Sequence, residues 1–260
     1  MALLLAWPAA AGNVIKHAAA TTYYSLDLNG TDEFVASGAA AIGMANAWTI
    51  SAWVKPDALD GAAGMMFADA APSSGNVNRR QLAIRPQTAN DPLQVSLYDS
   101  AGTQYKNYYY NSVFSAATWA HVVVTWNGTS IVTYVNNTAE TEDTASPDTT
   151  GTQTDTSQYF SVGYNYSAAN QWFNGEIGPI GIWTSVLGAT EVAVLYAGKF
   201  GMDISANSGN YTSSANLIHW WKPCQTNDTI ANALQDYKGT LTLNTTVQNV
   251  TTEDCVADAP

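Results

Sequence analysis

Tyrosine and asparagine side chains cluster at residues 106–111, whose sequence is KNYYYN. On a strand, Tyr108 and Tyr110 would share one face, with Asn107 and Asn111 adjacent. An exposed aromatic ring can stack on a sugar, and a neighbouring amide can hydrogen-bond to its hydroxyl groups. These four residues are therefore a candidate carbohydrate-binding surface.

Trp172, between a glutamine and a phenylalanine, is a second candidate for stacking on a sugar. The alternative for all of these aromatic residues is that they pack in the core or against a partner subunit, as tyrosines in sandwich proteins commonly do. We favour packing over sugar binding, and the exposure of the rings decides between the two.

Carboxylates and histidines form no recognisable catalytic pattern. A retaining glycosidase needs two carboxyl groups about 5 Å apart that flank the sugar. The closest acidic group, Glu140, Glu142 and Asp143, lies in a polar stretch rather than in a buried strand. His121 leads into a run of valines, which is typical of a structural histidine. We therefore expect a protein that is not an enzyme.

Four aspartates in expected loops are the candidate metal ligands, and calcium is the metal that suits such oxygen ligands. They are Asp32, Asp57, Asp60 and Asp99. Their spacing resembles no compact calcium-binding loop, so solvated turn residues are the favoured interpretation. Apart from calcium, no cofactor is expected.

The two cysteines, Cys224 and Cys255, both lie in the last quarter of the chain. A disulfide between them would pin the C-terminal segment and constrain the unfolded chain. The alternative is two separate thiols in a reducing compartment. The sequence leaves both alternatives open.

The composition argues against two classes of partner. The formal net charge is −12, with nine lysines and arginines against 21 acidic residues. Nucleic-acid binding needs a basic footprint, and anionic membranes also attract basic segments, so we expect neither partner. No apolar run reaches the roughly 20 residues that span a bilayer. Residues 1–20 are mostly apolar but include Asn13, Lys16 and His17, and we expect an arm docked on the domain or on a neighbouring subunit.

Local patterns predict an all-β fold with one short helix. Residues 119–128 (WAHVVVTWNG) and 130–135 (SIVTYV) read as a hairpin, because an Asn-Gly turn separates two β-branched runs. Residues 188–198 have the capping residue and apolar stripe of a short helix. Residues 138–156 are almost free of apolar side chains and predict an exposed loop. The predicted C-terminal strands are 216–223 (NLIHWWKP) and 240–250.

Five motifs in order resemble the laminin G-like, concanavalin A-like jelly-roll family over residues 23–200. They are SLDLNGTDEFV (25–35), WTISAWVKP (48–56), the WAHVVVTWNG hairpin with YVN, FNGEIGPIGIW (173–183) and LGATEVAVLY (187–196). The resemblance implies a two-sheet antiparallel sandwich. Asn137 replaces the family's usual glycine but can adopt the left-handed conformation. The expected organisation is an arm (1–20), the jelly-roll domain (21–200) and a C-terminal extension on the same sandwich (201–260).

The resemblance implies no single function, because fold alone does not choose one. Family members bind carbohydrate or protein, serve as accessory modules of enzymes or build surface assemblies. Our first hypothesis is a structural, decorating or adhesion protein of an extracellular particle, with a virion as the favoured case, that assembles with itself or with other particle subunits. The alternative is a secreted lectin-like module that binds surface glycans. Both place the protein outside the cell or on a virion surface.

Overall fold

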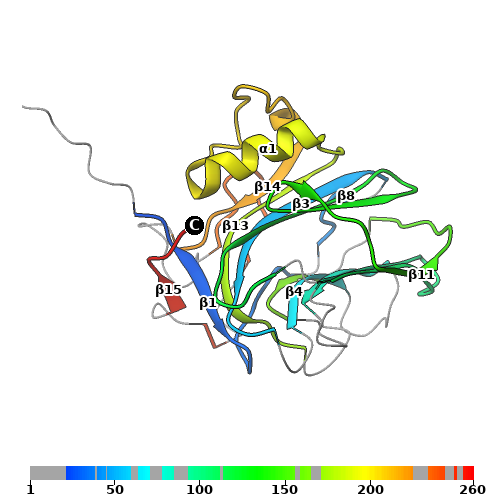
Figure 1. The fold of residues 1–260 in the computed structure, drawn as a ribbon, viewed down its shortest axis with the longest axis horizontal. Helices are drawn as coiled ribbons and strands as arrows, with labels where there is room; N and C mark the ends of the chain where they lie inside the picture. The colour runs from blue at the N-terminus through cyan, green and yellow to red at the C-terminus, as the bar shows by residue number, and fades with distance from the viewer. Residues whose placement is uncertain are drawn as a thin grey trace, which may run out of the picture.

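The structure is a computed structural model that describes residues 22–38, 40–44, 46–59, 64–70, 78–84, 93–111, 114–155, 159–164, 171–224, 234–243, 249–250 and 254–260. These residues form two antiparallel β-sheets packed face to face, with one α-helix on the outer face of the first sheet (Figure 1). The predicted apolar arm lies outside the described residues. Among the described residues, no helix combines the length and hydropathy needed to cross a membrane.

The first sheet has eight strands. In pairing order they are β10 (Thr138–Ala139), β9 (Ile131–Val135), β8 (Ala120–Trp126), β3 (Trp48–Pro56), β13 (Asn174–Trp183), β1 (Ser25–Asn29) and β15 (Cys255–Val256), and β14 (Leu217–Trp221) pairs with β13 as well. The second sheet has seven. They are β11 (Thr144–Asp148), β7 (Gln104–Tyr110), β6 (Leu93–Tyr98), β5 (Arg80–Ile84), β4 (Gly64–Ala70), β12 (Tyr159–Val162) and β2 (Val35–Ala36).

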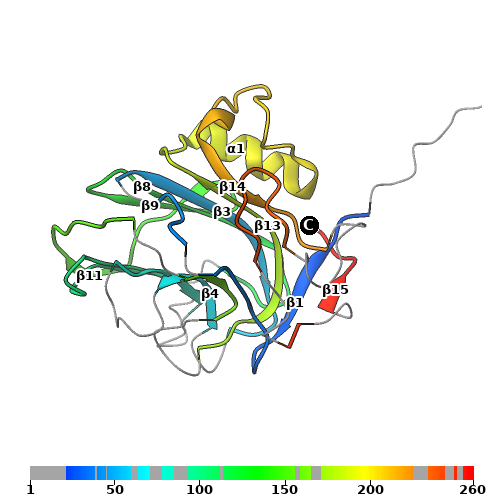
Figure 2. The same cartoon turned by 180° about the vertical axis from the view of Figure 1, so that it is seen from behind.

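The central strand β3 is covered on both faces. Trp48, Ile50 and the other residues of that face point into the core between the sheets. On the opposite face, the ring of Trp53 stacks on Tyr196 of α1 (Ala189–Gly198) at 5.7 Å. Figure 2 shows α1 on the side of the first sheet that faces away from β4 and β11. The two tryptophans of β3 therefore pack in two different apolar layers, one on each face of the strand.

Asparagine and glycine build the turns of the hairpin. The side chain of Asn127 accepts hydrogen bonds from the backbone N–H groups of Thr129 and Ser130, and Gly128 has a φ of +94°. Between β9 and β10, Asn136 and Asn137 have φ values of +50° and +67°. Asn137 thus takes the left-handed conformation expected of it in place of glycine.

The prediction that residues 138–156 form an exposed loop is wrong in one respect. β10 and β11 both lie in this range, and β11 pairs with β7 at the edge of the second sheet. Most side chains of β11 are exposed, and among the described residues no further strand pairs with that edge of the sheet. A strand at the edge of a sheet can have a polar sequence, so β11 lacks the apolar alternation that marks a buried strand.

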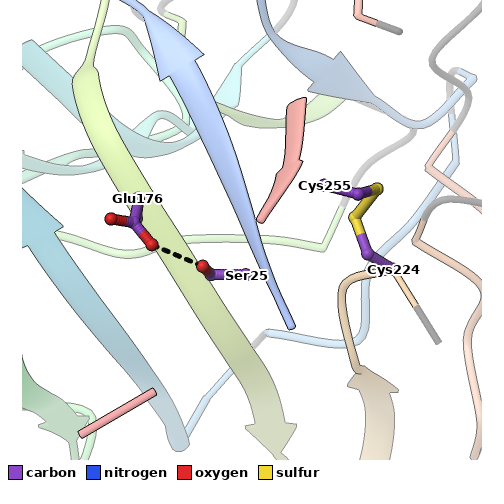
Figure 3. The surroundings of a disulfide bond; sticks show 4 residues. All are labelled: Ser25, Glu176, Cys224 and Cys255. Carbon is purple, nitrogen blue, oxygen red and sulfur yellow. Dashed lines mark hydrogen bonds between the residues drawn. A yellow bond between two sulfur atoms is a disulfide. The ribbon is translucent and has the colours of Figure 1, made fainter. Parts of the chain in front are cut away.

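The C-terminal extension is part of the sandwich. β14 confirms the strand predicted at 216–223, whereas the strand predicted at 240–250 is reduced, in its described residues, to a bridge between Leu243 and Leu234. Cys224 and Cys255 are joined by a disulfide, with 5.5 Å between their Cα atoms. Figure 3 shows this bond beside β15, together with the Ser25–Glu176 hydrogen bond of 2.5 Å that links β1 to β13.

Candidate functional site: an aromatic cleft at a strand join

Two strands meet end to end along one edge of β13. β14 pairs with its second half, where Trp221 is opposite Ile180, and β1 pairs with its first half, where Leu26 is opposite Ile177. Pro179 lies between the two ladders. Because proline has no backbone N–H to donate, the interruption of pairing at this position leaves no donor unsatisfied. The end of β14 and the beginning of β1 therefore converge above Pro179.

A cleft of about 400 Å³ opens at this join. Five aromatic residues line it, from the segment before β1, from the 3₁₀ helix η1 (Lys199–Gly201) that follows α1, from β14 and from the C-terminal extension. They are Tyr23, Tyr24, Phe200, Trp220 and Tyr237. The side chain of Tyr237 is 37% exposed, whereas Trp220 is 6% exposed and forms part of the wall. The volume is in the usual range for small-ligand sites.

Lys222 places a positive charge between two of these rings. Its Nζ lies 4.3 Å from the ring centroid of Trp220 and 4.2 Å from that of Tyr237. Such cation–π contacts hold an ammonium group beside aromatic faces. The cleft thus combines flat apolar surfaces with a strong hydrogen-bond donor.

Asp203 supplies an acceptor at the same opening. Its Oδ1 accepts hydrogen bonds from the Oγ (2.6 Å) and the backbone N–H (2.9 Å) of Ser205. These bonds are the main reason why the pKa of Asp203 is below its usual value, and the charge of Lys222 lowers this pKa further. The side chain is exposed, ionised at neutral pH and available to a ligand hydroxyl group.

Asp236, which is 7% exposed, fixes the position of Tyr237. Its carboxylate lies 2.7 Å from the Nδ1 of His219. It also accepts hydrogen bonds from the backbone N–H groups of Trp220 (3.0 Å), Lys238 (3.0 Å), Gly239 (2.8 Å) and Leu241 (3.1 Å). Although burial opposes ionisation, these donors together lower the pKa of Asp236 to about 2. One carboxylate therefore ties the segment carrying Tyr237 to β14.

A smaller cavity of about 30 Å³ lies next to the cleft and shares its lining residues Pro179, Met202 and Trp220. It is lined by Ser51 and by His121, whose Nε2 is 2.8 Å from the Ser51 Oγ. His121 is 1% exposed, and burial lowers its pKa to about 3. The space holds little more than water. The pair therefore has no room for a substrate, and His121 packs as a neutral core residue against Trp53.

Tyr108 and Tyr110 do not form the exposed platform that sugar binding would need. Tyr108 is 6% exposed and donates a hydrogen bond to Asp148, and Tyr110 is 1% exposed and accepts one from Thr133 across the sandwich. Both rings belong to the core between the sheets. Burial is also the main cause that raises the pKa of Tyr108 to about 12. The favoured alternative, packing of these two rings in the core, describes their position.

Asn107 is also unsuited to bind a ligand. It is 8% exposed, and its side-chain oxygen accepts hydrogen bonds from Gln94 (2.6 Å) and Ser96 (2.9 Å). Its Nδ2 donates to the carbonyl oxygen of Ser146. The side-chain amide of Asn107 therefore hydrogen-bonds β7 to β6 and to β11. Asn111 is half-buried at the end of β7.

Trp172 lies away from these residues, in a half-buried aromatic trio. Its ring centroid is 4.2 Å from that of Tyr164 and 5.6 Å from that of Phe34. The trio involves the ends of β2 and β12 in the second sheet, whereas the cleft is on the outer face of the first. The structure therefore does not bring the sequence-predicted sugar-binding residues together.

The candidate calcium ligands are separate turn residues. Asp99 accepts hydrogen bonds from the backbone N–H groups of Ala101 and Thr103, and Asp32 accepts them from two asparagine side chains. Asp57 is exposed after β3, and Asp60 lies outside the described residues. In the part of the chain that the structure describes, no three His, Cys, Asp or Glu side chains are grouped to hold a metal ion.

Sequence reasoning did not find the cleft, because its residues are distributed from Tyr23 to Tyr237. Two local signals were present: the Trp-Trp-Lys run that ends β14, and the Asp-Tyr-Lys-Gly turn at 236–239. Only the pairing of β14 and β1 along β13 shows that these segments face one another.

Comparison with solved structures shows where this fold occurs. A Bacteroides ovatus protein with an inferred role in carbohydrate binding matches with a TM-score of 0.59 and 13% identity, over 86% of this chain and 58% of its own. The chain thus spans less than two thirds of that protein. The heptameric SAP-like pentraxin of Limulus polyphemus matches with a TM-score of 0.52 and 14% identity, over 89% and 99% of the two chains.

A third similar structure is the CBM40 module of the Ruminococcus gnavus IT-sialidase, solved with α2,3-sialyllactose. Its TM-score is 0.51 at 13% identity, over 66% of this chain and 95% of the module. At such low identity these likenesses concern the fold alone. No curated protein sequence matches the chain.

Comparison with protein families gives a match over residues 29–193, which contain most of the two sheets and the beginning of α1. The matched range includes three of the five sequence motifs in full and most of the other two. This chain is therefore a member of the concanavalin A-like lectin/glucanases superfamily.

Proposed function

We propose that this protein is a non-enzymatic, lectin-like module that holds a saccharide in the aromatic cleft. The observation that carries the proposal is the exposed ring of Tyr237 beside Lys222 and Asp203 in a cavity of about 400 Å³. The apolar face of a sugar ring stacks on an aromatic side chain, and its hydroxyl groups need both donors and acceptors. The cleft offers all three.

The cleft is also preformed, which limits the entropy lost on binding. Asp236 fixes the segment of Tyr237 against β14, and the disulfide connects Cys224, two residues beyond Lys222, to Cys255. Cys255 is opposite Leu26, close to Tyr23 and Tyr24. Both walls are therefore held by contacts that do not involve a ligand.

Binding proteins among the similar folds support the same proposal. Two of the three structures compared above are described as carbohydrate-binding. A disulfide is typical of an oxidising compartment, so we place the protein outside the cell. We propose no catalytic role for the cleft. Glycoside hydrolysis uses two carboxylates, whereas Asp203 is the one carboxylate among the described lining residues.

The test is binding of oligosaccharides, first on a glycan array and then by calorimetry with the saccharides that bind. Tyr237→Ala removes an exposed ring, so we expect about tenfold weaker binding with an unchanged unfolding midpoint. Trp172→Ala is the matched control, because it removes a half-buried aromatic ring elsewhere. If Trp172→Ala abolishes binding and Tyr237→Ala leaves it intact, the cleft is not the site.

The hypothesis of a virion or particle component stays a prediction. None of the three similar structures is described as part of a virion, and the arm at residues 1–20 on which the hypothesis depended lies outside the described residues. The mass of the full chain in solution tests it. A decorating protein should form a closed oligomer, whereas a lectin-like module can be monomeric.

A further inference from the structure

The small cavity beside the cleft combines apolar walls with one hydrogen-bonding pair. Ser51 and His121 lie in its lining, with 2.8 Å between the Ser51 Oγ and the His121 Nε2. Apolar side chains form most of the remaining wall, among them Ile180, Leu195 and Ile204. A group that enters this space would therefore contact hydrocarbon on several sides and a polar pair on another.

The polar pair has hydrogen-bonding capacity that the described residues do not use. Burial lowers the pKa of His121 to about 3, so the ring is neutral at neutral pH and has one N–H group and one lone pair. Its Nε2 is next to Ser51, whereas its Nδ1 is buried and has no hydrogen-bond partner among the described residues. The Ser51 hydroxyl group can both donate and accept, so it can bind a further hydroxyl group while it stays bonded to His121.

The volume of the cavity limits what can enter it. About 30 Å³ is roughly twice the space that holds one water molecule, so the cavity has room for about two non-hydrogen atoms. A hydroxymethyl group has one carbon and one oxygen atom, and it is apolar at the carbon and polar at the oxygen. An acetamido group or a sugar ring has more atoms than the space can take.

The cavity can be reached from the cleft. Pro179, Met202 and Trp220 line both spaces. The ring centroid of Trp220 is 6.1 Å from that of Tyr237, so a sugar that stacks on Tyr237 lies beside the wall that the two spaces share. Met202 is half-buried, and its unbranched side chain can change rotamer to admit a small substituent.

We propose that a sugar held in the cleft inserts its exocyclic hydroxymethyl group into the small cavity, where the hydroxyl group bonds to Ser51. This inference rests on the proposed function and adds the class of sugar to it. Hexopyranosides, which carry the hydroxymethyl group, bind more tightly than pentopyranosides, which lack it. Ser51 then determines specificity, although it does not line the cleft itself.

The experiment compares three pairs of methyl glycosides whose members differ only in the hydroxymethyl group. They are methyl β-glucoside with methyl β-xyloside, methyl β-galactoside with methyl α-L-arabinopyranoside, and methyl α-mannoside with methyl α-lyxoside. Binding to the full chain is measured by NMR titration. One buried CH₂ group and one hydrogen bond together predict roughly tenfold tighter binding of the hexoside, in each pair whose ring configuration the cleft accepts.

Ser51→Thr tests the residue, because it adds a methyl group to the cavity and keeps a hydroxyl group. It should reduce the preference for the hexoside to about twofold or less and leave the affinity for the pentoside unchanged. Ser205→Thr is the matched control, since Ser205 lines the cleft but not the small cavity, and it should keep the preference. The unfolding midpoints show whether both variants fold, and the comparison of glycosides on the wild type needs no variant.

The outcomes separate this inference from the proposed function. If each pentoside binds as tightly as its hexoside, or if Ser51→Thr keeps the full preference, the hydroxymethyl group does not enter the cavity and the lectin-like function stands. The inference also fails if Ser205→Thr abolishes the preference as completely as Ser51→Thr does, or if saccharides on the array bind but none of the six glycosides does. If no saccharide binds on the array or in solution, both proposals fail.

Discussion

Replacing Asp236 by asparagine should destabilise the protein, because its carboxylate is held by several hydrogen-bond donors. The carboxylate accepts hydrogen bonds from four backbone N–H groups, approaches His219 at 2.7 Å and has a pKa lowered from 3.8 to about 2. A lowering of this size corresponds to about 2–3 kcal/mol that the charged form contributes to folding. Asp236→Asn keeps the shape but removes the charge, so it should lower the free energy of unfolding by about that amount.

The pH dependence provides the sharper measurement. Because the pKa of Asp236 is lower in the folded state than in the unfolded state, its contribution is complete above about pH 5 and is lost as the pH falls from about 4 to about 2. Urea unfolding, followed by tryptophan fluorescence, should therefore give a higher free energy of unfolding for wild type than for Asp236→Asn at pH 7. This difference should shrink as the pH falls toward 2.

The exposed Asp203 is the matched control, because its described hydrogen bonds are to a single residue, Ser205. Asp203→Asn should change the free energy of unfolding by no more than about 0.5 kcal/mol, as is usual for surface substitutions. The reasoning is refuted if the free energies of unfolding of wild type and Asp236→Asn differ by less than about 0.5 kcal/mol at pH 7, or if their difference is the same at pH 2 as at pH 7.

Two further predictions concern stability. Replacing Cys224 and Cys255 by serine should lower the free energy of unfolding by about 3–4 kcal/mol, because the disulfide closes a loop with a sequence separation of 31. If dithiothreitol does not shift the urea midpoint of the wild type, this prediction is wrong. His121, whose pKa burial lowers from 6.5 to about 3, should make the wild type lose up to about 1.4 kcal/mol per pH unit as the pH falls from 6.5 to about 3. His121→Asn should flatten this slope, and equal slopes in the two proteins would show that His121 is not buried neutral.

Local patterns predicted the central elements because their causes are local. β3 coincides with the WTISAWVKP motif, the hairpin strands β8 and β9 flank the Asn127–Gly128 turn, and α1 lies within the range of the predicted helix. In each case the apolar periodicity or the turn residue determines the conformation of residues only a few positions away in the sequence.

The tyrosines of β7 show where such reasoning ends. Tyr108 and Tyr110 were assigned correctly to one strand face, but a strand has two faces, and its sequence does not say which one is covered. A hydroxyl group is tolerated in the core when it finds a partner, as those of Tyr108 and Tyr110 do with Asp148 and Thr133. The cleft could not be predicted for a different reason, since its lining residues Tyr24 and Trp220 are more than 190 residues apart in sequence and are brought together by the pairing of β1 and β14 with β13.

The pairing of β15 with β1 determines how the molecule would carry a mechanical load. Ser25 is opposite Val256 and Leu26 is opposite Cys255 in an antiparallel ladder, so a pull between Tyr23 and Ala257 would open the ladder one pair at a time. At the second pair the force reaches Cys255 and passes through its covalent bond to Cys224, just beyond β14.

Tension on the two ends of the chain would therefore be delivered to the place where β14 and β1 meet above Pro179. A ligand that bridges the two walls there would resist that tension. In a molecule tethered at both ends, pulling and ligand occupancy would thus be coupled, and a stretched molecule would hold its ligand less tightly than a relaxed one.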